Sequence, residues 1–438
     1  MLRRSFLASP LALASPLMAA PPLPTKAELA AYRTKCRQVL LENILPFWYP
    51  STLDRSRGGF HLNHDALGQF QGPAPRMIVT QARMLWFFAR LARFGHQPKE
   101  MLAAAEHGFR FLRDAMWDKR HGGFFWEVAP DGKPTKPNKH LYGQSFALYA
   151  LAEYALASGR KEPLNLALKF FDLLEKQSHD GQYGGYVEYF LPDWSTAPPD
   201  EPIYMGGAGP GIKLMNTHLH LMEALTTLYR ASRSPLVAER LRELMAIESL
   251  AVLRKSPVAA TDKFNRDWTP RLEPAFARIS YGHDIENIWL LADAAAALNT
   301  PIHPYRELFE ANFAYCRQYG FDETHGGLYY LGNFNQPADD QTKSWWVQSE
   351  TLVSALTMYR LTSETRYFEV FAKTWAFVDK HQIDWKNGEW HASLPANGEL
   401  PTSKNLPGKA GPWKGPYHNG RAMIECIALL TELENKTA

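Results

Sequence analysis

The sequence Gly58-Gly59-Phe60-His61-Leu62 is the first copy of a pattern in which two glycines precede aromatic or apolar residues. The second glycine of each copy stands at position 59, 123, 185 or 327, and a degenerate copy, Asn387-Gly388-Glu389-Trp390-His391, has its glycine at 388. The steps between the glycines are therefore 64, 62, 142 and 61 residues. Because the third step is about twice the others, we expect a sixth copy without glycines near residues 262–268.

Segments with helical periodicity separate these copies. In residues 78–94, apolar side chains recur at positions 78, 82, 85, 89 and 92, which fall on one face of a helix. Comparable segments occupy residues 142–156, 217–229, 285–298, 348–361 and 419–433. A second helix in each unit is expected at residues 101–116, 162–177, 237–253, 305–318 and 366–381, after an initial helix at 26–44.

Six units of about 65 residues, each with a helix pair and a glycine-aromatic loop, predict an all-α fold. The architecture we expect is a closed (α/α)6 barrel that forms a single catalytic domain over residues 26–438. An open helical solenoid is the alternative, but its stacked pairs would normally lack long glycine-aromatic loops along one rim.

The first twenty residues have the composition of an export signal. Arg3 and Arg4 precede a mostly apolar run that ends in Ala19-Ala20, and no acid occurs in this segment. The arginine pair resembles a twin-arginine signal, which predicts a periplasmic or secreted protein. The alternative is a cytosolic protein with an apolar tail. No later segment reaches the roughly 20 unbroken apolar residues of a membrane span.

Charge and cysteine content exclude several classes of function. The net charge of the whole chain is +3, and without Arg3 and Arg4 it is near +1. No basic stripe is present that would follow a nucleic acid backbone. Cys36, Cys316 and Cys426 match no metal motif, so we expect buried thiols, with a Cys36–Cys426 disulfide as the alternative if the chain ends meet. We expect no metal and no cofactor, and either a monomer or a homodimer.

The stretch Ser280-Tyr281-Gly282-His283-Asp284-Ile285-Glu286 opens one of the expected helices. His283 and Glu286 stand three residues apart, which makes them neighbours on one helix face. A carboxylate beside an imidazole can fix its tautomer and raise its basicity. The pair is therefore a candidate for proton transfer, and a histidine that is hydrogen-bonded at a helix start is the alternative.

Further candidate residues lie at the starts of other expected helices. His418 follows a proline-rich loop, and Asn216, His220 and Glu223 share a helix face. His218 and His220 would chelate a metal poorly because residues two apart on a helix do not face each other, so we expect His218 to pack or cap. Arg83 lies in an apolar helix and needs a partner, either in an ion pair between helices or as a fixed cation for an oxyanion.

Aromatic residues gather in and near the glycine-aromatic loops. They suit sugar rings, whose C–H faces stack on aromatic planes while their hydroxyls form hydrogen bonds. We expect about half of them to pack in the core instead. Trp346 shares a helix face with Glu350. The set comprises Trp126, Tyr186, Tyr189, Tyr329, Tyr330, Trp345, Trp346, Trp390 and Trp413.

These residues fit two kinds of carbohydrate enzyme. A sugar epimerase or isomerase needs two near-neutral bases and a cation for the enediolate, which His283, His418 and Arg83 could supply. A glycoside hydrolase needs two carboxyl groups, and Glu223, Glu286 and Glu350 offer candidates without a spacing that selects a pair. A carbohydrate-binding module without catalysis would leave the pairing of His283 with Glu286 unexplained.

Four segments carry a resemblance to the N-acylglucosamine 2-epimerase superfamily, and within it to the cellobiose 2-epimerases. They are Asn216-Thr217-His218-Leu219-His220, residues 280–286, Lys343-Ser344-Trp345-Trp346-Val347-Gln348-Ser349-Glu350 and Gly415-Pro416-Tyr417-His418-Asn419. The resemblance implies an (α/α)6 barrel and epimerisation of the reducing-end glucose of a β-1,4-linked disaccharide to mannose. Members that act on N-acetylglucosamine or isomerise mannose to fructose share the layout.

The resemblance also assigns expected roles to the candidate residues. His283 and His418 would be the general acid and base, with Glu286 supporting His283 and Arg83 stabilising the enediolate. The remaining residues would bind the substrate, the two tryptophans by stacking on its sugar rings: Asn216, His220, Trp346, Trp413 and Glu350.

Overall fold

The structure is a computed structural model that describes residues 23–436 except 208, 255, 257 and 402–405. The predicted export signal lies outside the described residues. No helix in the described part of the chain is both long enough and apolar enough to cross a bilayer.

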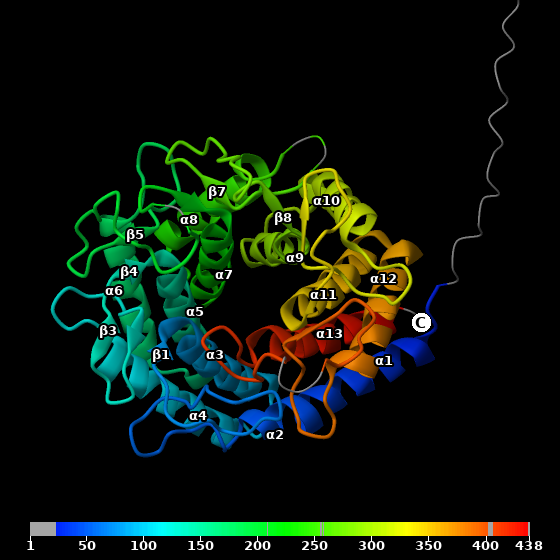
Figure 1. The fold of residues 1–438 in the computed structure, drawn as a ribbon, viewed down its shortest axis with the longest axis horizontal. Helices are drawn as coiled ribbons and strands as arrows, with labels where there is room; N and C mark the ends of the chain where they lie inside the picture. Colours follow the sequence, from blue (N-terminus) through cyan, green and yellow to red (C-terminus); the bar gives the residue numbers. More distant parts are fainter. Residues whose placement is uncertain (1–22, 208, 255, 257, 402–405, 437–438) are drawn as a thin grey trace, which may run out of the picture.

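Two concentric rings of helices form the molecule (Figure 1). Each inner helix packs against the next, and the last one returns to the first, so the inner ring is closed. The predicted (α/α)6 barrel is therefore confirmed, and the open solenoid is excluded. The inner helices are α3 (Ile78–Phe94), α5 (Leu141–Ser158), α7 (Met215–Ser232), α9 (Tyr281–Ala297), α11 (Trp345–Thr362) and α13 (Tyr417–Lys436). The outer helices are α1 (Lys26–Gln38), α4 (Pro98–Phe111), α6 (Lys161–Gln177), α8 (Pro235–Ala246), α10 (Arg306–Gly320) and α12 (Thr365–Phe377).

The position of a helix in the two rings explains its sequence pattern. An inner helix touches neighbours on both sides and an outer helix behind it, so α5 is buried from Leu141 to Ala155. An outer helix faces water on one side, so the buried residues of α6 form a single stripe. Four outer helices end in a wider π-helical segment: Val39–Ile44, Leu112–Met116, Ile247–Ala251 and Val378–Gln382. A short helix α2 (Leu45–Trp48) follows the first of these, and a 3-10 turn (His303–Tyr305) precedes α10.

Short antiparallel ladders connect neighbouring units at one rim of the barrel. A strand just before an inner helix pairs with a strand in the loop of the following unit, which fixes the entry of the inner helix. The pairs are β4 (Lys139–His140) with β5 (Tyr189–Phe190), β6 (Lys213–Leu214) with β7 (Lys263–Phe264), β8 (Arg278–Ser280) with β9 (Leu331–Asn333), and β10 (Lys343–Ser344) with β11 (Ser393–Leu394). β1 (Arg76–Met77) pairs with β2 (Glu127–Val128), which also pairs with β3 (Pro134–Lys136).

The glycine pattern forms the same tight turn in each unit. A backbone N–H donates to the carbonyl oxygen five residues later, and both glycines of the first copy have positive φ, +79° for Gly58 and +67° for Gly59. The donor and acceptor residues are Asp54 and Gly59, Asp118 and Gly123, Asp180 and Gly185, Arg254 and Ala259, Asp322 and Gly327, and Asp384 and Glu389.

The sixth turn corrects our expectation for residues 262–268. It lies earlier, where Leu253 pairs with Ala260 and Arg254 occupies the position of the aspartate. In the other five units this aspartate binds a buried basic side chain: Arg76, Lys139, Lys213, Lys343 or Lys409. The sixth copy has lost both the glycines and the acid, and so the sequence pattern could not locate it.

Several aromatic residues pack as expected in the core. Trp126, Tyr186, Tyr189 and Trp390 are at most 2% exposed. All three cysteines are buried free thiols.

Candidate active site

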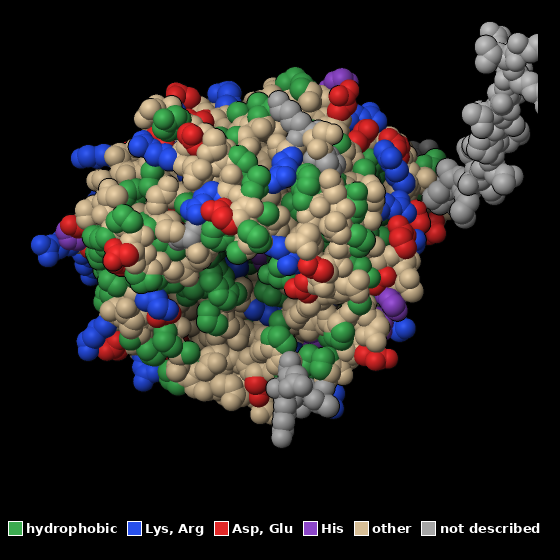
Figure 2. All heavy atoms as spheres, turned by 45° about the horizontal axis from the view of Figure 1, so that its top comes forward, with side chains coloured by type: hydrophobic (Ala, Val, Ile, Leu, Met, Phe, Trp, Pro, Cys, Tyr) green, Lys and Arg blue, Asp and Glu red, His purple; other side chains and the backbone are tan. Residues whose placement is uncertain are grey.

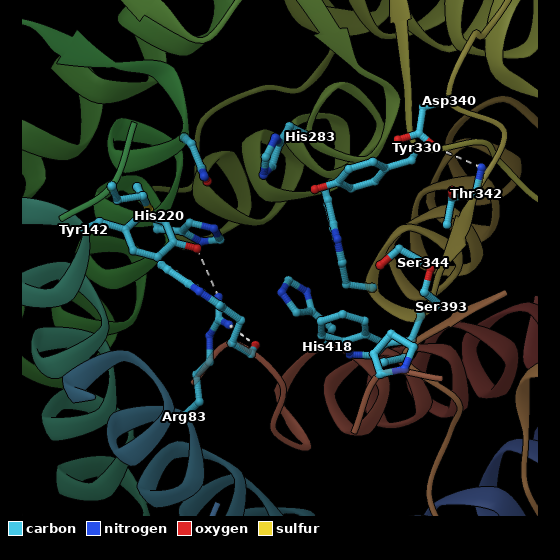
Figure 3. A pocket seen from close by; sticks show the side chains of 17 residues that line it. Arg83, Tyr142, His220, His283, Tyr330, Asp340, Thr342, Ser344, Ser393 and His418 are labelled. Atoms are coloured by element: carbon cyan, nitrogen blue, oxygen red, sulfur yellow. Dashed lines mark hydrogen bonds between the residues drawn. The ribbon is translucent and has the colours of Figure 1, made fainter. Parts of the chain in front are cut away.

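A cavity of about 470 Å³ opens at the rim from which the inner helices start. The hollow is visible near the centre of the face in Figure 2, and its side chains converge in Figure 3. The residues that line it are Arg83, Tyr142, Met205, Asn216, His220, His283, Tyr330, Asp340, Thr342, Ser344, Trp345, Trp346, Ala392, Ser393, Pro407, Trp413 and His418. The structure thus brings together seven of the nine sequence-predicted site residues, and Glu286 and Glu350 lie outside the lining.

The two candidate bases line the cavity, and both lie close to Trp346. The ring of His283, on the first turn of α9, lies 4.7 Å from the Trp346 ring, and the ring of His418, at the start of α13, lies 5.6 Å from it. Burial lowers the pKa of His283 to about 4, although Asp262 opposes the shift. Burial and the charges of Arg83 and Arg421 hold the pKa of His418 well below its ordinary value. Both imidazoles are therefore neutral near pH 7 and can accept a proton.

Of the two candidate bases, His418 is the one with a carboxylate partner. Its Nδ1 lies 2.6 Å from Oε1 of Glu350. The same Oε1 accepts a hydrogen bond from Arg421 Nη2 at 2.8 Å, and Oε2 of Glu350 accepts one from Trp289 Nε1 at 2.8 Å. A carboxylate at Nδ1 favours the tautomer in which Nε2 is the basic nitrogen. Glu350 therefore orients a base from below the cavity, which corrects our expectation that it contacts substrate.

The expected contact between Glu286 and His283 is not formed. Glu286 instead accepts a hydrogen bond from Arg421 Nη2 at 2.6 Å. Both residues lie in the first turns of α9, but His283 projects into the cavity while Glu286 is fully buried. Spacing along a helix made the pair possible, and the buried cation Arg421 offered Glu286 a stronger partner.

Arg421 lies at the centre of a buried cluster of three glutamates. It binds Glu223, Glu286 and Glu350, and its side chain is 1% exposed. Burial and the nearby Glu350 raise the pKa of Glu286 well above its ordinary value. Although burial opposes it, Arg421 lowers the pKa of Glu223 to about 2. One cation thus faces three carboxyl groups, and the protonated form is favoured in Glu286 and disfavoured in Glu223.

A set of possible metal ligands overlaps this cluster. Among the described residues, ligand atoms of Glu286, Glu350 and His418 lie within 4.8 Å of one another. The guanidinium of Arg421 already donates to both carboxyl groups of this set. The positive charge that the two glutamates require is therefore supplied by the protein.

Arg83 projects from α3 towards the cavity and binds neutral partners. Nη2 donates to the hydroxyl of Tyr142 at 3.2 Å, and Nη1 donates to the carbonyl oxygen of Trp413 at 3.2 Å. Its guanidinium also lies over the rings of Phe146 and Tyr417, at 4.2 and 4.8 Å. No carboxylate among the described residues pairs with it, so the ion-pair alternative is wrong. A fixed cation without a counterion suits an oxyanion.

The helix that begins with the His-x-His motif contributes Asn216 and His220 to the lining. Nδ1 of His220 lies 3.0 Å from Oε2 of Glu223, and so this ring is also held by a carboxylate. His218 points the other way, where its Nε2 accepts the N–H of Tyr186 at 2.9 Å and its Nδ1 lies 2.7 Å from the carbonyl oxygen of Leu214. The prediction that His218 packs or caps is confirmed, because its buried ring bonds the backbone and does not line the cavity.

Our sequence reasoning missed several residues of the site. Arg421 could have been found, because it is a basic residue beside the apolar run Ala422-Met423-Ile424 of a predicted helix, a signal like the one that identified Arg83. Tyr142 begins a predicted helix but carries no motif. Asp340 and Thr342 come from an irregular loop, for which the sequence offers no periodicity.

Comparisons with known proteins agree with this fold. The family model described as N-acylglucosamine 2-epimerase (GlcNAc 2-epimerase) matches residues 58–418. A cellobiose 2-epimerase of Bacteroides fragilis is 31% identical over 402 residues, which cover 90% of this chain and 98% of the relative. A D-mannose isomerase of Marinomonas mediterranea is 27% identical over 403 residues, which cover 89% of this chain and 96% of the relative. The solved structure of a cellobiose 2-epimerase from Spirochaeta thermophila matches with a TM-score of 0.81 and 35% identity over 92% of this chain and 98% of that one.

Proposed function

The chain belongs to the N-acylglucosamine 2-epimerase family and is a sugar epimerase or isomerase, and from that premise we propose that its substrate is a β-1,4-linked disaccharide such as cellobiose. In the proposed reaction the reducing-end glucose and mannose interconvert by proton transfer at C2. The likeness to cellobiose 2-epimerases over about nine-tenths of the chain supports this choice of substrate.

The observation that carries the proposal is that His283, His418 and Arg83 line one cavity, and that the hydrogen-bond partners of Arg83 are neutral. In the open-chain aldose, the C1 carbonyl acidifies the hydrogen on C2. One neutral imidazole removes this proton, and the electron pair moves into an enediolate whose oxygen faces Arg83. The other imidazole takes up a proton from solvent before the reaction and delivers it to the opposite face of C2. Glu350 stabilises the charged form of His418 during this exchange.

The carboxyl groups argue against glycoside hydrolysis. That chemistry needs two carboxyl groups at the scissile bond. Glu223, Glu286 and Glu350 lie beneath the cavity and bind Arg421, and Asp340 is the sole carboxylate among the described residues that line it.

Proton NMR of the purified enzyme with cellobiose in deuterated water tests the proposal. We expect deuterium at C2 together with a mannose-type anomeric signal. A ketose signal would keep the proton transfer and assign an aldose–ketose isomerase, and exchange with N-acetylglucosamine alone would assign an N-acylglucosamine epimerase. Release of free glucose without exchange at C2 would contradict the proposal.

We also propose that the protein is exported, on the basis of Arg3, Arg4 and the apolar run that follows them. Mass spectrometry of the protein from a native host would show a shortened N-terminus. An intact N-terminus on cytosolic protein would contradict export.

A further inference from the structure

Asp340 lines the cavity in an orientation fixed by its own loop. Its backbone N–H donates to Leu331 O at 3.2 Å, and its carbonyl oxygen accepts from the N–H groups of Tyr330 and Leu331 at 3.2 and 3.3 Å. The Oδ1 atom accepts the N–H of Thr342 at 3.1 Å. A carboxylate held in this way presents its remaining acceptor positions without further ordering cost.

No basic side chain in the described part of the chain forms an ion pair with Asp340. The neighbouring Asp339 differs, because its carboxylate binds Arg278 and accepts a hydrogen bond from Asn333 Nδ2 at 2.9 Å. Asp339 is also absent from the cavity lining. Asp339 therefore forms an ion pair within the protein, whereas Asp340 faces the cavity.

The place of Asp340 relative to the histidines defines what it can touch. Tyr330 lies beside it in Figure 3 and packs edge-on against Trp346, with ring centroids 6.2 Å apart. The Trp346 ring in turn lies close to the rings of both His283 and His418. Asp340 is therefore one aromatic side chain further from the histidines than Trp346 is. The hydroxyls of Thr342 and Ser393 belong to the same lining.

We propose that Asp340 binds hydroxyl groups of the second sugar ring, the one that is not epimerised, and that it selects uncharged disaccharides over monosaccharides and sugar acids. The inference rests on the proposed function, because it requires the reacting ring to lie between the two histidines. A carboxylate accepts charge-assisted hydrogen bonds from hydroxyls. It repels a carboxylate or phosphate on the same ring.

The test compares Asp340→Asn with the matched control Asp339→Asn. The asparagine keeps an oxygen for the N–H of Thr342 but loses the negative charge. For cellobiose, Asp340→Asn is expected to raise KM by about 10- to 100-fold, the value of one or two bonds to a charged group, with kcat within about twofold of wild type. For glucose or mannose, KM should stay unchanged, and Asp339→Asn should resemble wild type with every sugar.

A charged substrate distinguishes two effects of Asp340→Asn: the loss of hydrogen bonds to sugar hydroxyls, and the loss of repulsion towards an acidic sugar. With a disaccharide whose non-reducing ring is glucuronic acid, kcat/KM of the wild type should be far lower than with cellobiose, and Asp340→Asn should narrow that gap. Equal changes in KM for cellobiose and for the monosaccharides would overturn the inference, as would equal behaviour of the two variants. Exchange at C2 of monosaccharides with no reaction of cellobiose would also overturn it while leaving the epimerase chemistry intact. Absence of C2 exchange with every sugar would instead reject the proposed function.

Discussion

At the scale of single residues, the charge of the site is set by two arginines in different surroundings. Arg421 is buried and binds three glutamates, whereas Arg83 binds a hydroxyl, a carbonyl oxygen and two aromatic rings. Arg421 therefore holds in place Glu350, the carboxylate that orients His418. Arg83 leaves its charge available to an oxyanion that forms in the cavity.

Replacement of Glu286 or Glu223 by glutamine should change the free energy of unfolding by different amounts. Because the raised pKa of Glu286 favours its neutral form, Glu286→Gln should change the free energy of unfolding by no more than about 1 kcal/mol. Glu223 is ionised, so Glu223→Gln leaves Arg421 with less compensation and should cost about 3 kcal/mol or more. Urea unfolding at pH 7 measures both. Equal destabilisation by the two substitutions would show that Glu286 is ionised as well.

Arg83→Gln should lower kcat by about 100- to 1,000-fold, the usual loss when an oxyanion donor is removed. Its partners are neutral, so no charge is left unpaired and the fold should persist. Steady-state kinetics and circular dichroism check the two statements. A kcat close to that of wild type would remove Arg83 from the mechanism.

At the scale of elements, the inner helices α3, α5, α7 and α11 are each fastened to the turn of their unit by one side chain. Gln81, Gln144 and Gln348 each bond the backbone N–H and C=O of the residue after the glycine pair. In α7 the same position is His218, which accepts the N–H of Tyr186. The repeat thus explains why His218 is present although it has no part in the chemistry: it bonds the turn as glutamine does in three other units.

This histidine should make stability depend on pH. Burial lowers the pKa of His218 to about 4, from an ordinary value of 6.5. Between these values the unfolded chain binds the proton and the folded chain does not, so stability is full above pH 6.5 and falls as the pH drops towards 4. The loss is at most about 3 kcal/mol.

His218→Gln installs the residue that three other units use at this position. We expect the variant to fold and to lose less stability between pH 6.5 and 4 than wild type does. Thermal melting across this pH range measures the difference. Identical pH profiles for the two proteins would show that His218 does not titrate in this window.

At the scale of the whole molecule, sequence periodicity predicted the ring because five of six units keep their glycine turn. The closed barrel follows from the count of units and from the apolar faces of helices such as α3 and α11. The sixth turn escaped detection because Arg254 and Ala259 share no residue type with the other copies. The partner of His283 was wrongly predicted because the competing cation, Arg421, lies on a different helix and far away in the sequence.

The packing of the first described helix against the last also bears on the cysteines. Helix α1 packs against α13, and Cys36 and Cys426 are both buried as thiols. We expect no thiol to react with a disulfide reagent in the native protein and all three to react after unfolding without reductant. Only one reactive thiol in the unfolded chain would indicate a Cys36–Cys426 disulfide.

The central claim is that two histidines on different helices serve the two faces of C2. The most direct measurement follows epimer formation and C2 deuteration by NMR for wild type, His283→Ala and His418→Ala with cellobiose in deuterated water. We predict that neither variant forms the epimer although both remain folded by circular dichroism, and that any exchange they retain occurs without inversion at C2. Epimer formation at the wild-type rate in either variant would contradict the account.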